Sequence, residues 1–117
     1  MNDSRKFTIK SRIWINTEDG PFLGEGRVEL LRKIHETGSM AKAAKSMNMS
    51  YKKAWGLVNS MNMQFPKALV IRTTGGLNGG GSILSESGKM LLDLFTQLNE
   101  NNKLYLQNEL NKLDFLK

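Results

Sequence analysis

The sequence predicts a mainly helical fold with a small amount of β structure, an α+β domain, on the strength of three observations. Apolar residues recur at helical spacing in four separate stretches, glycines crowd a segment between two short apolar strands, and an alternating apolar stretch lies near the N-terminus. The 117 residues, 39% of them hydrophobic, suffice for one globular domain with its own core. We therefore expect a single domain over 1–117, with a β-hairpin at 7–23, a helical core at 26–84 and a long terminal helix at 85–114.

The N-terminal stretch predicts a β-hairpin over residues 7–23. Its apolar residues alternate with other side chains, which is the periodicity of a strand. The turn that follows contains Asp19-Gly20, a pair typical of tight turns. Residues 21–23 can return as a short edge strand, in which Pro21 limits pairing. The alternating residues are Phe7, Ile9, Ile13 and Ile15.

The first helix of the predicted core covers residues 27–36. Its apolar residues fall three apart and therefore share one face, which we expect to pack inward. Thr37 and Gly38 end this helix, with the glycine at the position where helices commonly stop. The residues of the inward face are Val28, Leu31 and Ile34.

A pair of short helices follows, at 40–47 and 50–63. Ser39 and Ser50 each stand where an N-cap residue accepts the free amide protons of a first helical turn. Two short helices joined by a tight turn, here at 48–49, have the layout of a helix-turn-helix, whose second helix enters the major groove of DNA. A helical hairpin that only builds a core would show the same pattern.

Charge separates these two interpretations. From Thr37 to Ser85 there is no Asp or Glu, although six Lys or Arg lie there, and the eleven basic residues elsewhere are balanced by eleven acidic ones. The net charge of +6 therefore lies on the helix pair and on the segment after it. A surface whose charges are all positive favours a polyanionic partner such as nucleic acid. An anionic membrane surface is the main competitor, but it calls for bulky apolar residues beside the basic ones, and here Ser, Asn and Gly stand between them.

Two short strands, at 68–71 and 82–84, are predicted on either side of the glycine-rich segment 72–81. A Walker phosphate loop would need Gly-Lys-Ser/Thr at the start of a helix, whereas Gly80-Gly81-Ser82 lacks the lysine and leads into a strand. We interpret the segment as a β-ribbon, or wing, whose backbone amides and Arg72 reach DNA phosphates. With the preceding helices it completes a winged helix-turn-helix.

The last predicted helix begins after Ser85 and runs to about residue 113, roughly 42 Å at 1.5 Å per residue. Such a helix overshoots a small domain, and its later leucines have no expected cover from their own chain. The simplest burial is against a second copy, which makes the protein a homodimer. A break at the polar residues 99–102, followed by a fraying tail, is the alternative. The apolar sets before and after that break are Met90, Leu91, Leu94, Phe95 and Leu98, then Leu106, Leu110, Leu113 and Leu116.

The composition argues against several classes of function. There is no cysteine, so disulfides and Cys-based zinc sites are not expected, and the single histidine, His35, has no partner for a catalytic triad or a multi-histidine metal site. We expect no metal, no cofactor and no enzymatic activity. The sequence contains no run of 18 apolar residues, so it predicts no membrane-spanning helix. Its first residues are polar, so it predicts no signal peptide. The absence of cysteine fits the cytoplasm.

With this order of elements the sequence resembles the DNA-binding domain of ModE-type molybdate-responsive regulators. The resemblance covers about residues 24–98, and SYKKAW at 50–55 with TGGLNGGG at 74–81 is specific to it. LysR-type regulators look like more distant relatives of the same region. The resemblance implies a winged-helix fold, a homodimer through the terminal helices and a role as a transcription regulator. The matching residues are Gly24 to Arg27, Gly38, Ser39, Ala43 to Lys45, Ser50 to Lys52, Ala54, Trp55, Asn59, Met61, Asn62, Thr74 to Gly76, Gly79 to Gly81, Leu84 and Gly88.

Full-length ModE proteins bind molybdate through a second part built of small β-barrel domains. Residues 1–117 do not contain such a part, so we do not expect molybdate sensing by this chain. The hairpin ahead of Gly24 looks like what short stand-alone relatives carry, and the motif implies no role for it.

The charge and the resemblance together give the candidate DNA-binding residues. On helix 50–63, taken as the recognition helix, Lys52 and Lys53 can bond guanine or phosphate, and Trp55 can stack on the backbone or pack internally. The preceding helix would face the DNA backbone, and the wing at 72–82 would lie on the backbone or in the minor groove. A winged helix used only for protein–protein contact is the alternative function. The candidates are Lys42, Lys45, Ser50, Tyr51, Lys52, Lys53, Trp55, Arg72, Thr73, Thr74 and Asn78.

Overall fold

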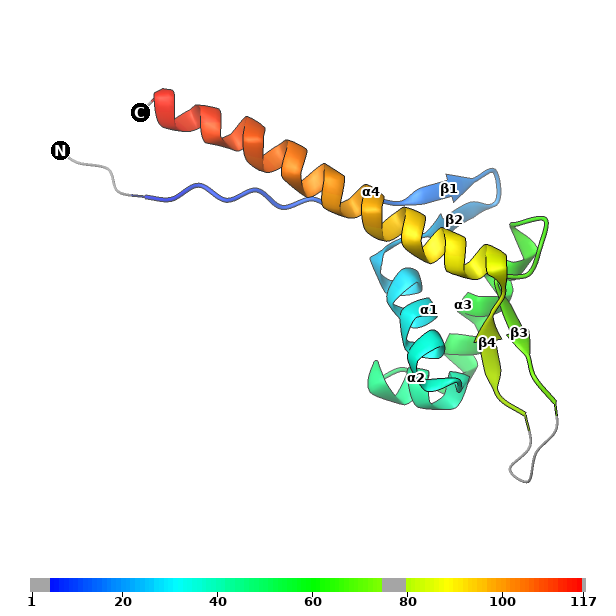
Figure 1. Ribbon diagram of the computed structural model, residues 1–117. Coiled ribbons are helices and arrows are strands. Elements are labelled where there is room, and N and C mark those ends of the chain that lie inside the picture. The colour runs from blue at the N-terminus through cyan, green and yellow to red at the C-terminus, as the bar shows by residue number, and fades with distance from the viewer. Residues whose placement is uncertain (1–4, 75–79, 117) are drawn as a thin grey trace.

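The computed structural model describes residues 5–74 and 80–116 and confirms a mainly helical chain with two small β-hairpins (Figure 1). Three helices form the centre, one hairpin precedes them, a second hairpin follows as the wing, and a long helix ends the chain. The elements are β1 (Ile15–Thr17), β2 (Gly20–Leu23), α1 (Glu25–Thr37), α2 (Met40–Ser46), α3 (Tyr51–Met63), β3 (Val70–Arg72), β4 (Ser82–Leu84), α4 (Glu86–Leu110) and a 3₁₀ helix (Asn111–Phe115).

Helix α1 is the centre of the core. It buries four apolar side chains and contacts α2, α3, β2, β4 and α4. Gly38 ends it with a left-handed φ of 69°, a conformation that favours glycine, and the Gly38 amide donates to the carbonyl of Ile34 at 2.8 Å. The predicted stop is therefore confirmed. The four buried residues are Val28, Leu30, Leu31 and Ile34.

The helix pair forms as the sequence predicts, because its caps are local. The hydroxyl of Ser39 accepts from the amide of Lys42, and the hydroxyl of Ser50 accepts from the amide of Lys53, both at 3.1 Å. Asn48 makes the turn between the helices with a φ of 53°, a left-handed conformation that asparagine tolerates better than most residues. The two serines therefore fix where α2 and α3 begin.

Both hairpins are antiparallel, and the two sheets are separate. In the wing, Val70 pairs with Leu84 and Arg72 with Ser82. The amide of Ser82 donates to the carbonyl of Gly38 at 3.0 Å, which ties the wing to the turn between α1 and α2. The wing therefore has a fixed origin beside the helix pair.

The prediction of a strand from Phe7 was wrong, although the hairpin itself is confirmed. Pairing begins only at Ile15, because the returning strand β2 has four residues and α1 starts at Glu25. Residues 5–14, here called the arm, instead run beside α4 (Figure 1). The side-chain amide of Asn102 on α4 donates to the hydroxyl of Ser11 at 3.0 Å and holds the arm there.

The structure confirms the long last helix and corrects one expectation about it. Helix α4 continues through residues 99–102, without the alternative break, and passes into the 3₁₀ helix after Leu110. Its later leucines do have cover from their own chain: Leu106 borders a cleft with Ile9, and Leu110 borders another with Phe7. Leu106 and Leu110 are therefore half-buried within their own chain, whereas Leu116 is 79% exposed.

The start of α4 is turned differently from the prediction. Leu92 and Phe95 are buried, whereas Met90, Leu94 and Leu98 are 69%, 55% and 41% exposed. Gly88 fixes this rotation, because it lies so close to β3 that a Cβ there would collide with the carbonyl oxygen of Leu69. Leu92 and Phe95, four and seven positions after Gly88, therefore face the core. Met90, Leu94 and Leu98 lie on the neighbouring face of the helix, which is exposed.

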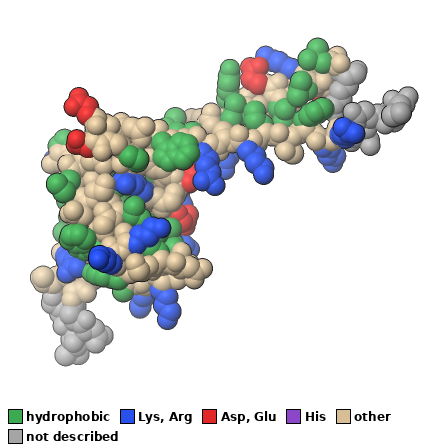
Figure 2. All heavy atoms as spheres, turned by 180° about the vertical axis from the view of Figure 1, so that it is seen from behind, with side chains coloured by type: hydrophobic (Ala, Val, Ile, Leu, Met, Phe, Trp, Pro, Cys, Tyr) green, Lys and Arg blue, Asp and Glu red, His purple; other side chains and the backbone are tan. Residues whose placement is uncertain are grey.

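The molecule is elongated because α4 and the arm project from the core. Its extents are 69 × 29 × 21 Å and its radius of gyration is 18.6 Å, against about 13 Å for a compact chain of this length. Figure 2 shows the projecting part from behind, with Lys and Arg side chains along its lower edge.

Candidate nucleic-acid interface

The N-terminal half of α3 presents its polar and aromatic side chains to solvent. Ala54, Val58 and Met61 are buried against the core, as the spacing predicts. Tyr51 and Trp55 are 46% and 48% exposed. Lys52 and Lys53 lie beside them and are exposed, while the hydroxyl of Ser50 is occupied by its capping bond. Five of the candidate residues thus lie together on one end of one helix.

The wing is joined to this end of α3 by a hydrogen bond between candidates 21 positions apart. The guanidinium Nη2 of Arg72 donates to the hydroxyl of Tyr51 at 2.6 Å. A polar hollow of about 300 Å³ lies beside the pair, bordered by the start of α2 and the base of the wing. The structure therefore brings Tyr51, Arg72, Thr73 and Thr74 together.

Thr73 and Thr74 have different surroundings within the wing. The hydroxyl of Thr73 accepts from the amide of Gly81 at 2.8 Å, and the Thr73 amide donates to the Gly81 carbonyl at 2.9 Å. Thr73 therefore holds the two sides of the wing together, whereas Thr74 is exposed. Asn78 lies outside the described residues.

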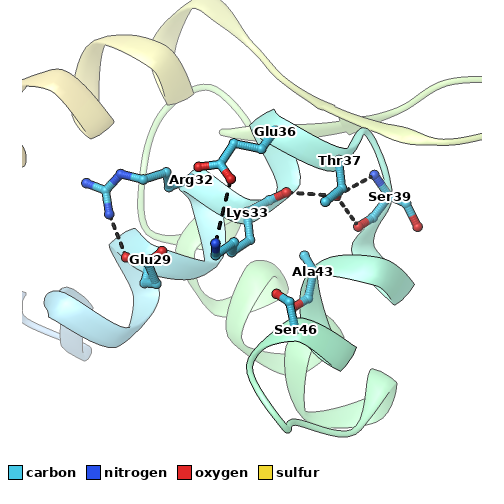
Figure 3. A network of polar contacts seen from close by, with 8 residues as sticks. All are labelled: Glu29, Arg32, Lys33, Glu36, Thr37, Ser39, Ala43 and Ser46. Carbon is cyan, nitrogen blue, oxygen red and sulfur yellow. Dashed lines mark hydrogen bonds and ion pairs between the residues drawn. The ribbon is translucent and has the colours of Figure 1, made fainter.

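The turn that places α2 is built around Thr37 (Figure 3). Its hydroxyl donates to the carbonyl of Lys33 at 2.7 Å and accepts from the amide of Ser39 at 3.2 Å. This arrangement sets the direction in which α2 leaves α1. Lys42 and Lys45 then stand exposed on α2.

The cations of α2 and α3 have no carboxylate partner within the described part of the chain. The ion pairs found there lie on α1, on α4 and at the start of the 3₁₀ helix, each between residues three apart. The positive charge of these lysines is therefore not neutralised by neighbouring acids and is available to a partner in solution. The pairs are Arg32–Glu29 and Lys33–Glu36, both drawn in Figure 3, with Lys89–Glu86 and Lys112–Glu109.

Asn62, near the end of α3, is a positioning residue to which the sequence assigns no role. Its Oδ1 accepts from the amides of Leu69 at 2.8 Å and Val70 at 3.2 Å, and its Nδ2 donates to the carbonyl of Val70 at 3.2 Å. The single side chain of Asn62 thus makes the hydrogen bonds that a neighbouring strand would make, and it joins the base of the wing to α3. The sequence signals for it are an asparagine in the last helical turn ahead of Pro66 and its place among the residues that match ModE-type regulators.

The N-terminal hairpin braces the same helix from its other end. Gln64, just after α3, donates to the carbonyl of Pro21 at 2.8 Å, and its Oε1 contacts the hydroxyl of Thr17. Arg27 donates to the hydroxyl of Ser60 on α3 at 3.0 Å, and burial lowers the pKa of its guanidinium from the ordinary value. Phe22 also stacks on Phe65, with ring centroids 5.8 Å apart. The hairpin therefore fixes α3 in place.

Comparison with known proteins identifies this arrangement. Residues 26–89, from α1 to the start of α4, match the family described as bacterial regulatory helix-turn-helix proteins of the lysR family. The chain belongs to this family. Its arm and hairpin lie outside the matched region, which covers the helix-turn-helix and the wing.

Several relatives carry the name ModE. The chain is 36% identical over 88 residues to the molybdenum transport protein ModE of Azotobacter vinelandii, which is 75% of this chain and 33% of the relative. It is 40% identical over 84 residues to the transcriptional regulator ModE of Haemophilus influenzae, 72% of this chain and 33% of the relative. With the DNA-binding transcriptional dual regulator ModE of Escherichia coli K12 it shares 40% over 77 residues, 66% of this chain and 29% of the relative. The chain spans about a third of the length of these relatives.

The match identifies a helix-turn-helix domain of the lysR regulatory family that is homologous to part of the ModE transcriptional regulators. Among residues 5–74 and 80–116, no three His, Cys, Asp or Glu side chains gather in a way that would hold a metal ion. No helix in the described ranges is both long and apolar enough to cross a bilayer.

Proposed function

We propose that the chain binds specific sites on double-stranded DNA with α3 in the major groove, its N-terminal half toward the bases. The observation that carries this proposal is the group of exposed, unpaired cations at the start of α3, next to a wing joined to it through Tyr51 and Arg72. A helix in the groove reads base edges through side chains near its N-terminus. Lys52 and Lys53 fill that role.

The other candidates position the protein on the backbone. Lys42 and Lys45 on α2 contact phosphates, as does the Tyr51–Arg72 pair at the junction of helix and wing. Thr74 and Asn78 extend the contact along the wing, residues 72–82, over the backbone or the minor groove. Ser50 and Thr73 act mainly through their internal hydrogen bonds, which hold the helix start and the wing in shape. Trp55 stacks on the sugar–phosphate backbone with its exposed half.

The protein acts as a homodimer, and the open face of α4 is the surface we assign to the partner copy. Met90, Leu94 and Leu98 form an exposed apolar stripe along the helix, with Leu104 and Tyr105 further on. Helix-turn-helix regulators commonly bind as dimers on two half-sites about one helical turn apart. An isologous contact between two such stripes buries apolar surface on both copies.

The alternative is a winged helix that contacts only another protein. An acid-free surface disfavours it, because protein interfaces tend to have few charges at their centre. As a transcription regulator it would act in the cytoplasm.

The test is DNA binding by a charge-matched set of variants. Bound sites are selected from random duplexes, and affinity is measured by gel shift between 50 and 200 mM salt. The wild type, contacting about six to ten phosphates as a dimer, should lose about 10³- to 10⁵-fold in affinity over that range. The double variant Lys52→Ala, Lys53→Ala should lose discrimination between selected and random DNA and remain a dimer.

The matched control is Lys89→Ala, Lys112→Ala, which removes the same charge from residues paired with acids on or beside α4. It should bind nearly as the wild type does. Equal losses in both variants would mean that only net charge matters. A wild type with no salt-sensitive DNA binding would favour the protein-contact alternative.

A further inference from the structure

The arm holds its basic side chains outward. Ser11 is fixed to α4 through Asn102, and burial alternates along the segment that follows it. The odd-numbered residues face the protein and the even-numbered ones face solvent, as in an extended chain. The half-buried set is Ser11, Ile13 and Ile15, and the exposed set is Lys10, Arg12 and Trp14.

The outward cations border two clefts that adjoin. One, of about 600 Å³, lies between the arm, the start of α1 and α4, and Lys10, Arg12 and Lys103 line it. The other, of about 270 Å³, lies between the arm, the start of α1 and α3, and Arg12, Arg27 and Lys53 line it. Because Arg12 borders both, these five cations form one continuous row from the recognition helix to α4, here called the basic track.

The basic track is not neutralised by its surroundings. Among the described residues, the one acid that lines either cleft is Glu25, in the first turn of α1, where the helix dipole favours a carboxylate. Within the described part of the chain, Lys10, Arg12, Lys53 and Lys103 form no ion pair. On α1, on α4 and at the start of the 3₁₀ helix, four other cations each pair with an acid three residues away. These four unpaired cations, together with Arg27, which donates to the hydroxyl of Ser60, therefore differ from the ordinary solvated surface.

Basic side chains of the projecting part lie on the side of the molecule toward which the wing strands run. In Figure 1 the strands β3 and β4 run toward the bottom of the view. In Figure 2, turned about the vertical axis, Lys and Arg side chains gather along the lower edge of the projecting part. The lower edge of the projecting part and the strands of the wing thus face the same side of the molecule.

We propose that the basic track is a second DNA-contacting surface, which binds the phosphodiester backbone of the duplex already held by α3. This inference rests on the proposed function and extends it beyond the family's matched region, because Lys10 and Arg12 precede residue 26 and Lys103 follows residue 89. Duplex DNA offers one phosphate every 3.4 Å along each strand, so a row of cations meets a row of anions. Contacts of this kind fix position on the duplex and read no bases.

The test compares salt dependence for a mixed-sequence duplex of about 30 base pairs. In the double variant Lys10→Ala, Arg12→Ala, the negative slope of log affinity against log salt should become shallower by about 1.8 per protomer, because each phosphate contact contributes about 0.9 to it. Hydroxyl-radical footprints on a selected site should lose protection on one side of each half-site only. The charge-conserving exchange Lys10→Arg, Arg12→Lys should restore the wild-type slope and footprint.

The control is again Lys89→Ala, Lys112→Ala, which should leave slope and footprint unchanged. A wild-type slope in the Lys10, Arg12 variant would overturn the inference and leave the proposed function intact. Dissociation of the dimer without a change in slope would also overturn it, because the arm would then contact a second copy. A wild type that does not bind DNA would overturn both.

Discussion

The side chain of Asn62 offers a sharp test of how the wing is held. Its three hydrogen bonds reach the backbone of Leu69 and Val70, both buried. Each such bond contributes about 0.5–1.5 kcal/mol, and buried amides left without a partner add to the loss. Asn62→Leu, which keeps the volume and removes the polar atoms, should lower the free energy of unfolding by about 2–4 kcal/mol.

Urea unfolding followed by far-UV circular dichroism measures this loss. With a slope of about 1–2 kcal/mol/M for a chain of this size, the midpoint should fall by at least about 1 M. The matched control is Asn59→Ala on the same helix, because the Asn59 amide reaches only the sulfur of Met63, at 3.6 Å. It should change stability by less than about 0.5 kcal/mol. An Asn62→Leu variant as stable as that control would refute the bracing role.

Two further variants test the interface and the dimer. Tyr51→Phe removes the hydroxyl bonded to Arg72 and should weaken DNA binding about fivefold, which is equivalent to about 1 kcal/mol. The stability of the protein should change little. Full DNA affinity in this variant would show that the Tyr51–Arg72 pair does not act on DNA. Leu94→Lys places a charge in the apolar stripe of α4 and should shift the protein to monomer in sedimentation equilibrium, whereas Lys112→Ala should not. A dimer that survives Leu94→Lys would mean that another face holds the copies together.

The sequence predicts what depends on neighbouring residues. The caps at Ser39 and Ser50 act three residues ahead, so spacing alone locates the starts of α2 and α3. Gly38 ends α1 for a similarly local reason. The missing acids between Thr37 and Ser85 predict a cationic face, because an acid can reach that face only from another part of the chain.

The sequence does not predict contacts between distant residues. Alternation from Phe7 is real, but a strand also needs a partner, and β2 is too short to provide one. The rotation of α4 depends on how closely Gly88 approaches Leu69, a tertiary contact. The bond between Tyr51 and Arg72 likewise joins two elements. Each residue was visible in the sequence, but its neighbour in space was not.

The central claim is that the start of α3 and the base of the wing contact duplex DNA. Amide chemical-shift mapping by NMR, with a selected duplex titrated into isotope-labelled protein, tests it most directly. The account predicts that the largest shifts fall on residues 50–55, with a second group at 72–74 and 80–82. Shifts confined to the open face of α4 or to the β1–β2 hairpin, with residues 50–55 unchanged, would contradict it.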